Sequence, residues 1–372
     1  MKKNFVMKAL CFILIIYSLP LPFTVICSAE QEEAEMQKVA YTSEEALPTL
    51  ADGVEVGSRF FELLFGKEEK PEELALIPGG GVFGVKIKQK YVTVTESPGI
   101  PALKPGDIIL SVGGKPVHSA AEVKAIVASC GGNSLTIRAK HKESEIAVEI
   151  RPSLENGEYK LGITIRDGAA GLGTVTFIDP KTGVFGGLGH GICDSDSGEV
   201  IDMESGDALG VILGGIHKGE SGKPGELCGV LTERDIGDLS VNCQCGVFGI
   251  LTQIPQASQT VFVGRRDEVT AGEATIISTL KNGKTAEYKI EIYDVDYTSD
   301  GSKSFRIRVK DETLKALTGG IVRGMSGSPI MQNGKLIGAV THVLVADPTE
   351  GYGIFIENML SYANIMEIKD AA

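Results

Sequence analysis

Hydrophobic and polar positions divide the chain into a leader, a charged stretch and a long β-like remainder. Residues 9–26 form a nearly unbroken apolar run, which three lysines precede and an acidic stretch follows. This order is typical of an export signal. Pro20 and Pro22 interrupt the run, which disfavours a permanent spanning helix but leaves an uncleaved anchor open. Residues 1–29 are therefore predicted to be a signal peptide or membrane anchor that places the following chain outside the cytoplasm.

Residues 30–73 read as an acidic linker. They carry 13 acidic and four basic residues, a net charge of −9. A mobile tether of this kind is an easy site for proteolysis. Over all 372 residues, 36 Lys and Arg against 49 Asp and Glu give a net charge of −13. Because a nucleic-acid binder needs a basic patch to replace phosphate counterions, we predict no nucleic-acid partner.

Residues 74–155 alternate short β-like runs with glycine turns and one helical stretch. A glycine turn at residues 78–81 leads into an alternating strand. Residues 103–117 predict a Pro-Gly turn, a buried strand and a hairpin closed by two glycines. Ser119 is placed to cap a helix that ends near residue 129, and two more strands are expected at 134–139 and 145–150.

This order resembles a PDZ domain, a small α+β fold. By that resemblance, a peptide would add as a strand to the sheet edge beside the helix. Consecutive amides at a glycine turn can bind an anion without a charged side chain. The residues expected to capture the peptide carboxylate are Gly80, Gly81, Val82 and Phe83. The alternative is that these glycines only form a turn.

Residues 156–372 keep a short β-like periodicity with no convincing long helix. Runs such as 173–178 and 208–213 are separated by Gly, Asp and Asn turns. The 47 glycines of the chain fit many tight turns between short strands. Strands at this density predict a β-barrel or paired barrels, so the fold class is mainly β.

Two polar residues in this half are framed by glycines: His190, and Ser326 on a sharp turn before a strand. Serine becomes a good nucleophile when a base removes its proton, and a tight turn can aim its Oγ outward. The amides of Gly324 and Ser326 are natural oxyanion donors because backbone N–H groups need no reorganisation as charge develops. The pattern predicts Ser326 as nucleophile and His190 as base.

Several neighbouring residues compete for these roles. Ser326 is preferred to Ser328 because it precedes a glycine, as in the G-x-S-G turn of chymotrypsin-like proteases, and Ser328 is expected to support the turn. His342 follows a strand and could line the substrate cleft. Spacing leaves the acid open, because many aspartates lie between His190 and Ser326. They are Asp194, Asp196, Asp202, Asp207, Asp235, Asp238, Asp267, Asp294, Asp296, Asp300 and Asp311.

Five cysteines follow the leader and raise the question of a metal site. Cys243 and Cys245 could join Cys228 and His217 as zinc ligands, but their C-x-C spacing is shorter than the usual C-x2–4-C. Small buried thiols are the favoured interpretation. We therefore predict no metal and no cofactor.

The segments around His190 and Ser326, with residues 338–343 and 347–353 and the preceding PDZ-like block, resemble the SpoIVB peptidase family. The similarity covers nearly the whole chain. It implies a serine endopeptidase with a chymotrypsin-like arrangement. It also implies that Asp311, shortly before the nucleophile, is the third member of the catalytic triad.

The resemblance further implies a signalling role in a sporulating bacterium. The peptidase would be secreted from the forespore into the space between the two membranes and would be associated with the membrane through its N-terminal segment. It would cleave itself near its N-terminus and then a membrane-bound regulator, which triggers processing of a late sigma factor. The expected partners are thus peptide or membrane-protein substrates, its own N-terminal region included.

Two other functions remain open from sequence. An exported PDZ adaptor with an inactive protease half would bind peptides without hydrolysing them. An HtrA-like quality-control protease would degrade many substrates, although such enzymes usually place the protease half before the PDZ domain.

Overall fold

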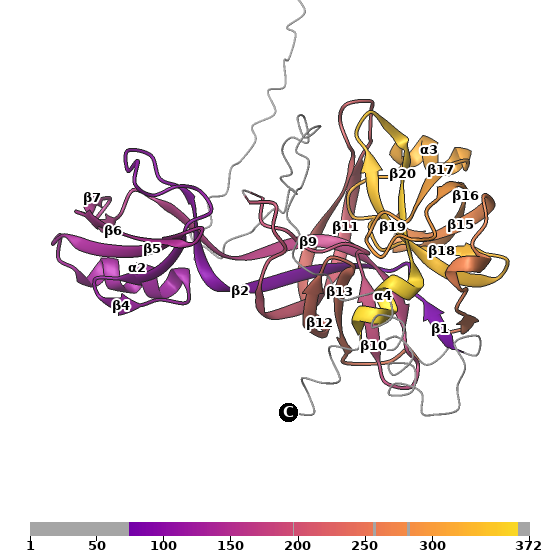
Figure 1. Ribbon diagram of the computed structural model, residues 1–372, viewed down its shortest axis with the longest axis horizontal. Helices are drawn as coiled ribbons and strands as arrows, with labels where there is room; N and C mark the ends of the chain where they lie inside the picture. Colours follow the sequence, from indigo (N-terminus) through magenta and orange to yellow (C-terminus); the bar gives the residue numbers. More distant parts are fainter. Residues whose placement is uncertain (1–73, 196, 256–257, 281–282, 364–372) are drawn as a thin grey trace, which may run out of the picture.

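The computed structural model describes residues 74–363 apart from 196, 256–257 and 281–282. The predicted export segment (1–29) and acidic linker (30–73) lie outside the described residues. The described chain is mainly β, and Figure 1 shows a small lobe joined by two long strands to a larger body. Within the described part, no helix is both long and apolar enough to cross a membrane.

The small lobe is the PDZ-like domain. Its helix α2 (Ala120–Ser129) begins after Ser119, whose side chain accepts a hydrogen bond from the amide of Glu122. The helix buries Val123 and Val127 against the sheet. The capping prediction is therefore confirmed. The other elements of the lobe are β3 (Ile108–Val112), β4 (Lys115–Pro116), β5 (Leu135–His141), β6 (Ser144–Ile150), β7 (Ser153–Glu155) and β8 (Glu158–Lys160).

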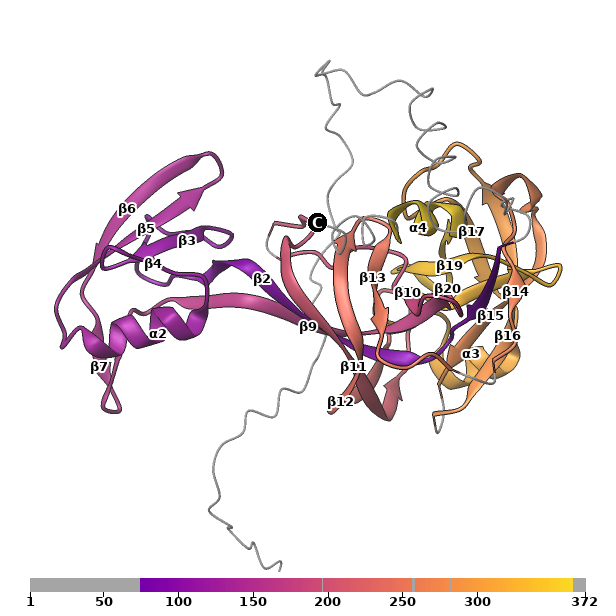
Figure 2. The same ribbon diagram turned by 90° about the horizontal axis from the view of Figure 1, so that it is seen from below.

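Two antiparallel strands, β2 (Val82–Glu96) and β9 (Thr164–Ile178), connect the lobe to the body. Figure 2 shows them running side by side from one unit into the other. They pair at both ends, and their register shifts between Lys88 and Thr93. Such a bulge bends a strand pair locally. The lobe is thus inserted between two strands that both belong to the body.

The body begins with a first barrel, in which β2 and β9 pair with each other and complete a ring of six strands. The order around it is β9, β10, β13, β12, β11 and β2. Its core contains Phe83 and Phe185, whose rings meet edge to face at 5.9 Å. The remaining bounds are β10 (Val184–Gly187), β11 (Met203–His217), β12 (Glu226–Cys243) and β13 (Gly246–Leu251).

The second barrel is closed by six strands in the order β15, β16, β17, β20, β19 and β18. Its fully buried core includes Phe305 and Phe355, with ring centroids 5.3 Å apart. The bounds are β15 (Gly272–Thr279), β16 (Thr285–Val295), β17 (Phe305–Val309), β18 (Pro329–Gln332), β19 (Lys335–Leu344) and β20 (Asp347–Phe355). Shorter elements nearby are β1 (Ala75–Pro78), β14 (Val261–Phe262), η2 (Arg266–Glu268), α3 (Glu312–Thr318) and α4 (Ile356–Ala363).

A third apolar cluster joins the two barrels. It combines Phe177 and Phe248 of the first barrel with Ile354 of the second and Met359 of α4, all nearly or fully buried. Burying such side chains stabilises an interface by roughly 1.5–3 kcal/mol each. The relative position of the barrels, and with it any site between them, is therefore fixed by packing.

The domain boundary differs from the predicted division into 74–155 and 156–372. Residues 82–88 at the start of β2 pair with β9 and β11 in the first barrel and lie outside the lobe. An alternating strand carries the same pattern whichever sheet it joins, so the sequence does not mark this crossing.

Candidate active site

His190 lies on the turn that follows β10 in the first barrel. Two residues before it, Leu188 has φ of 67° and is buried, and Gly189 has φ of 69°. A left-handed backbone at a non-glycine residue is uncommon. A Cβ on Gly189 would lie 2.9 Å from the Cγ2 of Thr341 on β19. The glycine is thus required by the close approach of the second barrel.

The imidazole of His190 is held by the following backbone. Its Nδ1 lies 2.9 Å from the carbonyl oxygen of Gly191. Because a carbonyl only accepts, Nδ1 carries the proton, and a neutral ring then has its basic lone pair on Nε2. This is the tautomer that a general base for serine requires.

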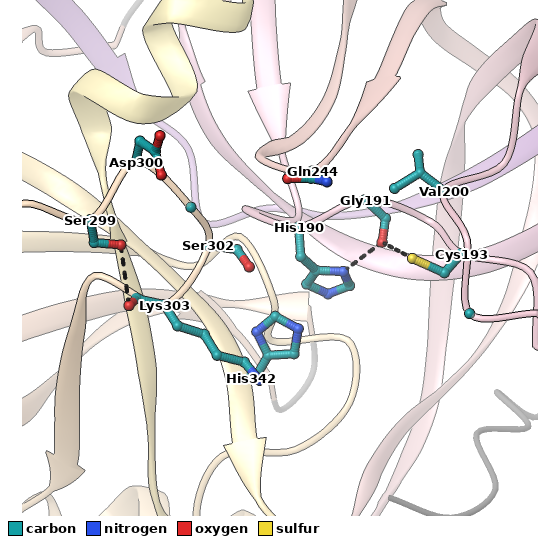
Figure 3. A pocket seen from close by; sticks show the side chains of 12 residues that line it. His190, Gly191, Cys193, Val200, Gln244, Ser299, Asp300, Ser302, Lys303 and His342 are labelled. Atoms are coloured by element: carbon teal, nitrogen blue, oxygen red, sulfur yellow. Dashed lines mark hydrogen bonds between the residues drawn. The ribbon is translucent and has the colours of Figure 1, made fainter. Parts of the chain in front are cut away.

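His190 and His342 lie next to each other in the lining of a pocket of about 520 Å³ between the barrels (Figure 3). Their ring centroids are 4.9 Å apart. The loop before β17 contributes Ser302 and Lys303 to the same pocket, and Cys193 lines the opposite side. The expectation that His342 lines a cleft agrees with this position.

Burial, the neighbouring His190 and Lys303 together lower the pKa of His342 to about 3. His342 is consequently neutral at neutral pH. Its buried Nδ1 has no hydrogen-bond partner within the described residues. A neutral ring beside His190 does not oppose the positive charge that a catalytic base acquires.

Ser326 lies on a turn that precedes β18 in the second barrel. Gly324 has φ of 94° and Gly327 has φ of 92°, so both flanking positions need glycine. The hydroxyl of Ser326 donates to the carbonyl of Thr341 at 2.7 Å. The amide of Gly327 donates to Val340 at 2.7 Å, which ties the turn to β19.

The two glycine turns are directly adjacent in space. A Cβ on Gly327 would lie 2.4 Å from the amide nitrogen of Leu188 in the His190 turn. The carbonyl of Ser326 accepts a hydrogen bond of 2.9 Å from the amide of Thr174 on β9, and the carbonyl of Thr174 accepts one from Leu188 at 3.2 Å. The structure therefore brings together the two segments predicted to carry the base and the nucleophile.

The predicted oxyanion donors, the amides of Gly324 and Ser326, belong to this turn. Within the described chain, neither the amide of Gly324 nor that of Ser326 donates to a protein acceptor. The neighbouring amides of Met325, Gly327 and Ser328 all do. The two amides expected to receive an oxyanion are thus the ones that the turn leaves available.

Sequence reasoning missed two threonines that support the turn. On β9, Thr174 Oγ1 donates to the carbonyl of Gly324 at 2.8 Å, and Thr176 Oγ1 donates to that of Gly327 at 2.7 Å. Both side chains are fully buried. The sequence Thr-Val-Thr-Phe at residues 174–177 looks like an ordinary strand, and only the long-range pairing reveals the role.

Asp311 lies elsewhere and has a different partner. Its side chain is the N-cap of α3, where Oδ1 accepts from the amides of Thr313 and Leu314 at 2.9 and 3.0 Å. Oδ2 lies 3.4 Å from the amide of Lys289. In this structure Asp311 is a helix cap, because the first turn of α3 offers amides that need an acceptor, and it does not contact His190.

The predicted carboxylate-binding residues Gly80, Gly81, Val82 and Phe83 do not lie in the PDZ-like lobe. Val82 and Phe83 begin β2 in the body, and Gly80 and Gly81 directly precede it. The amide of Gly80 donates to the carbonyl of Val175 at 2.8 Å. Gly80 is also enclosed on its other side, since its carbonyl accepts from Thr279 at 2.7 Å. Phe83 is fully buried. The prediction that these residues bind a peptide carboxylate is therefore wrong, and the glycines form a turn that leads into β2.

The lobe offers another edge beside α2. The first residues of β9 pair on one side with β2, and Gly162, just before the strand, has φ of 71°. Ile163 and Ile165 pack against the lobe core that contains Val123 of α2. A glycine turn before residues 164–167 is the sequence signal that could have located this edge.

Comparison with known proteins finds two family models that match the chain. A family model described as SpoIVB peptidase S55 matches residues 157–360, and a PDZ domain model matches residues 94–140. Among curated proteins, no significant match to the chain was found.

Solved structures resemble parts of the chain. The PDZ domain of the SdrC-like protein from Listeria monocytogenes is 25% identical, with a TM-score of 0.20, over 22% of this chain and 93% of that one. The inactive form of the Rv3671c protease is 12% identical, with a TM-score of 0.30, over 53% of this chain and 84% of that one. The active form of the same protease, from M. tuberculosis, is 11% identical, with a TM-score of 0.30, over 51% and 71%.

Proposed function

The chain belongs to the SpoIVB peptidase S55 family and is a serine peptidase with a PDZ domain; from this premise we propose that Ser326 and His190 hydrolyse peptide bonds at the junction of the two barrels. The observation that carries the proposal is the contact between the two glycine turns through Thr174. It holds the turn that carries the Ser326 hydroxyl against the turn that carries His190, whose imidazole lines the pocket.

The reaction would begin with a rotation of the Ser326 side chain. Its hydroxyl now donates to the carbonyl of Thr341, whereas attack requires it to donate to Nε2 of His190. In this proposal, rotation about the Cα–Cβ bond of Ser326 would exchange the carbonyl of Thr341 for His190 as the acceptor. His190 would then take the proton as Oγ bonds to the substrate carbonyl carbon, and return it to the leaving amine. Water would hydrolyse the resulting ester by the reverse sequence.

Charge on the tetrahedral intermediate would be received by the amides of Gly324 and Ser326. Their position on a turn that Thr174 and Thr176 fix from behind supports this role, because preorganised donors stabilise developing charge without rearranging. Removing one such donor typically costs about 2.7–4 kcal/mol in the barrier.

One group that orients His190 is the carbonyl of Gly191. Asp311 could take over that role only by giving up the amides of Thr313 and Leu314. We therefore propose Asp311 as a structural cap in the resting chain. Its participation in a triad would mark a different, activated conformation.

We further propose that the peptidase is exported and acts in sporulation signalling. In this role it cleaves its own N-terminal region and then a membrane-bound regulator, which triggers processing of a late sigma factor in the space around the forespore. The leader and the acidic stretch at residues 30–73 in the sequence support this proposal. The PDZ-like lobe would recruit substrate by adding a peptide strand to residues 164–167 of β9 beside α2.

The central test is covalent labelling of the purified chain with a serine-directed phosphonate, followed by mapping of the labelled residue. We expect the label on Ser326 and none on the Ser326→Ala chain. Label on another serine, or an active chain that takes none, would overturn the catalytic assignment. A labelled chain that hydrolyses nothing would favour the adaptor alternative.

The signalling role has a separate test. Mass spectrometry of the active chain should find N-terminal truncation within residues 30–73, and the Ser326→Ala chain should remain intact over the same incubation. Broad degradation of unfolded casein would instead favour quality control.

A further inference from the structure

A cluster of potential metal ligands lies outside the peptidase pocket, at the end of the long ribbon formed by β11 and β12. The last residue of β11, His217, pairs with the first residue of β12, Glu226, and Cys228 pairs with Gly215. Because side chains alternate along a strand, Glu226 and Cys228 project from one face, and His217 is their cross-strand neighbour on that face. The register alone thus gathers an imidazole, a carboxylate and a thiol.

The donor atoms are already close together. His217 Nδ1 lies 2.9 Å from Glu226 Oε1 and 3.5 Å from Cys228 Sγ. One ligand atom from each of the three residues can be chosen so that all three lie within 4.8 Å of one another. The side chain of His217 is 73% exposed and that of Glu226 is 18% exposed, so one side of the cluster is open to solvent.

We propose that His217, Glu226 and Cys228 bind a thiophilic divalent cation of the Zn²⁺ type. Zinc binds imidazole nitrogen, carboxylate oxygen and thiolate at about 2.0–2.3 Å, which in a tetrahedron separates neighbouring ligand atoms by about 3.3–3.8 Å. The separation from His217 Nδ1 to Cys228 Sγ is already in this range, and that from Nδ1 to Glu226 Oε1 is a few tenths of an ångström shorter. Three protein ligands leave a fourth position for water.

The site differs from the zinc set considered from the sequence. Cys245 is buried, and its thiol lies 3.7 Å from the carbonyl of Asp300, so it belongs to the region between the barrels. Cys243 ends β12, seventeen positions after its first residue. The C-x-C pair therefore does not join Cys228. Glu226, which carries no motif in the sequence, completes the set through the strand register.

The ribbon end also contacts the segment that carries the nucleophile. The amide of Leu227 donates to the carbonyl of Arg323 at 2.9 Å, and the amide of Arg323 donates to that of Gly225 at 2.9 Å. Arg323 directly precedes Gly324. A cation bound to Glu226 would thus fix the backbone that flanks the turn. Because a ligand that binds the folded state stabilises it, occupancy should raise the melting temperature.

Cobalt titration of the full chain tests the proposal. The chain would carry Ser326→Ala, so the result does not depend on peptidase activity, and would be reduced and freed of metal first. We expect one equivalent of Co²⁺ to bind with a thiolate-to-cobalt charge-transfer band, and Zn²⁺ to displace it, as the relative affinities of these ions predict.

Variants identify the ligands. Cys228→Ser should remove the charge-transfer band, and His217→Ala and Glu226→Gln should each weaken binding by at least about tenfold. The matched controls Cys130→Ser and His118→Ala, both in the PDZ-like lobe, should bind like the parent. Circular dichroism of each metal-free variant checks that it folds. A parent chain that gives no thiolate band, or a folded Cys228→Ser chain that binds like the parent, would overturn the site.

Discussion

The two barrels of the body differ in how far their strands extend beyond them. In the first barrel, β2, β9, β11 and β12 have 15 to 18 residues and continue into the PDZ-like lobe or the exposed ribbon. In the second barrel the strands have 4 to 11 residues and form a closed unit. The first barrel therefore connects the site to its surroundings, whereas the second holds a rigid turn.

Each barrel supplies one half of the proposed catalytic pair. His190 follows β10 in the first barrel, beside a pocket, and Ser326 precedes β18 in the second, on a turn held by backbone hydrogen bonds. Neither barrel alone contains both groups. Activity of the proposed pair would therefore depend on the packed interface between the barrels as much as on either turn.

The largest expected effect is the loss of activity when either residue of the proposed catalytic pair is replaced. Ser326→Ala and His190→Ala should each lower kcat for peptide hydrolysis by about 10⁴- to 10⁶-fold, and the double variant should be little worse than the poorer single one. Ser328→Ala is the control: Ser328 is buried behind the turn, and its hydroxyl has no partner within the described residues. Additive losses in the double variant would show that the two residues do not act as a unit.

The next largest effect concerns the stability of each barrel. Phe83→Ala in the first and Phe305→Ala in the second should each lower the free energy of unfolding by about 3–5 kcal/mol, because both rings are fully buried. Val230→Ala on the exposed ribbon should change it by less than about 0.5 kcal/mol. Urea unfolding measures all three. Two separate transitions, each sensitive to one variant, would show that the barrels unfold independently.

Acid should weaken the chain partly through His342 at the barrel junction. Its pKa is lowered to about 3 in the folded chain, whereas an unfolded histidine has its ordinary value of 6.5. Between these values the unfolded state binds a proton that the folded state does not, so stability falls as pH falls, by up to about 1.4 kcal/mol per pH unit from this group.

Urea unfolding at pH 4 to 7 should accordingly give a flatter pH dependence for His342→Gln than for the parent. Equal slopes for His342→Gln and the parent would contradict the assigned burial.

A smaller effect tests the link from the first barrel to the nucleophile turn. Thr174→Val keeps the side-chain shape but leaves the carbonyl of Gly324 without its donor, at a cost of about 1–3 kcal/mol in stability and a lower kcat. Thr232→Val, which removes a similar bond to Gly210 on the ribbon, should leave kcat unchanged. Equal kcat values for the two variants would show that the hydrogen bond from Thr174 to Gly324 does not contribute to catalysis.

The smallest effect distinguishes a cap from a catalytic acid at Asp311. Asp311→Ala should cost about 1 kcal/mol in thermal unfolding, whereas Asp311→Asn should preserve stability because asparagine caps equally well. We expect the Asn variant to retain most peptidase activity if α3 stays capped during turnover. A stable Asn variant that has lost activity would show that the carboxylate leaves the helix and joins His190.

The sequence predicts some of these features because they are local. A capping serine sets the start of α2, and glycines on either side of His190 and Ser326 mark turns that aim side chains outward. The contributions of Thr174, Thr176 and Glu226 are invisible there, since each depends on which strands pair. The point at which β2 passes from the first barrel into the lobe is not visible in the sequence for the same reason. The position of Asp311 in the sequence fits a helix cap and a catalytic acid equally well.

The strand pair β2 and β9 connects the lobe to the body, and its regular pairing is interrupted between the two. Between Lys88 and Thr93 the ladder of hydrogen bonds is interrupted, while ion pairs from Lys88 to Glu204 and from Lys90 to Asp202 brace the barrel side of that interruption. Force from a peptide bound to the lobe would act on the strand pair at this interruption. From there β9 continues to Thr174, so the force would be transmitted to the strand that holds the Ser326 turn.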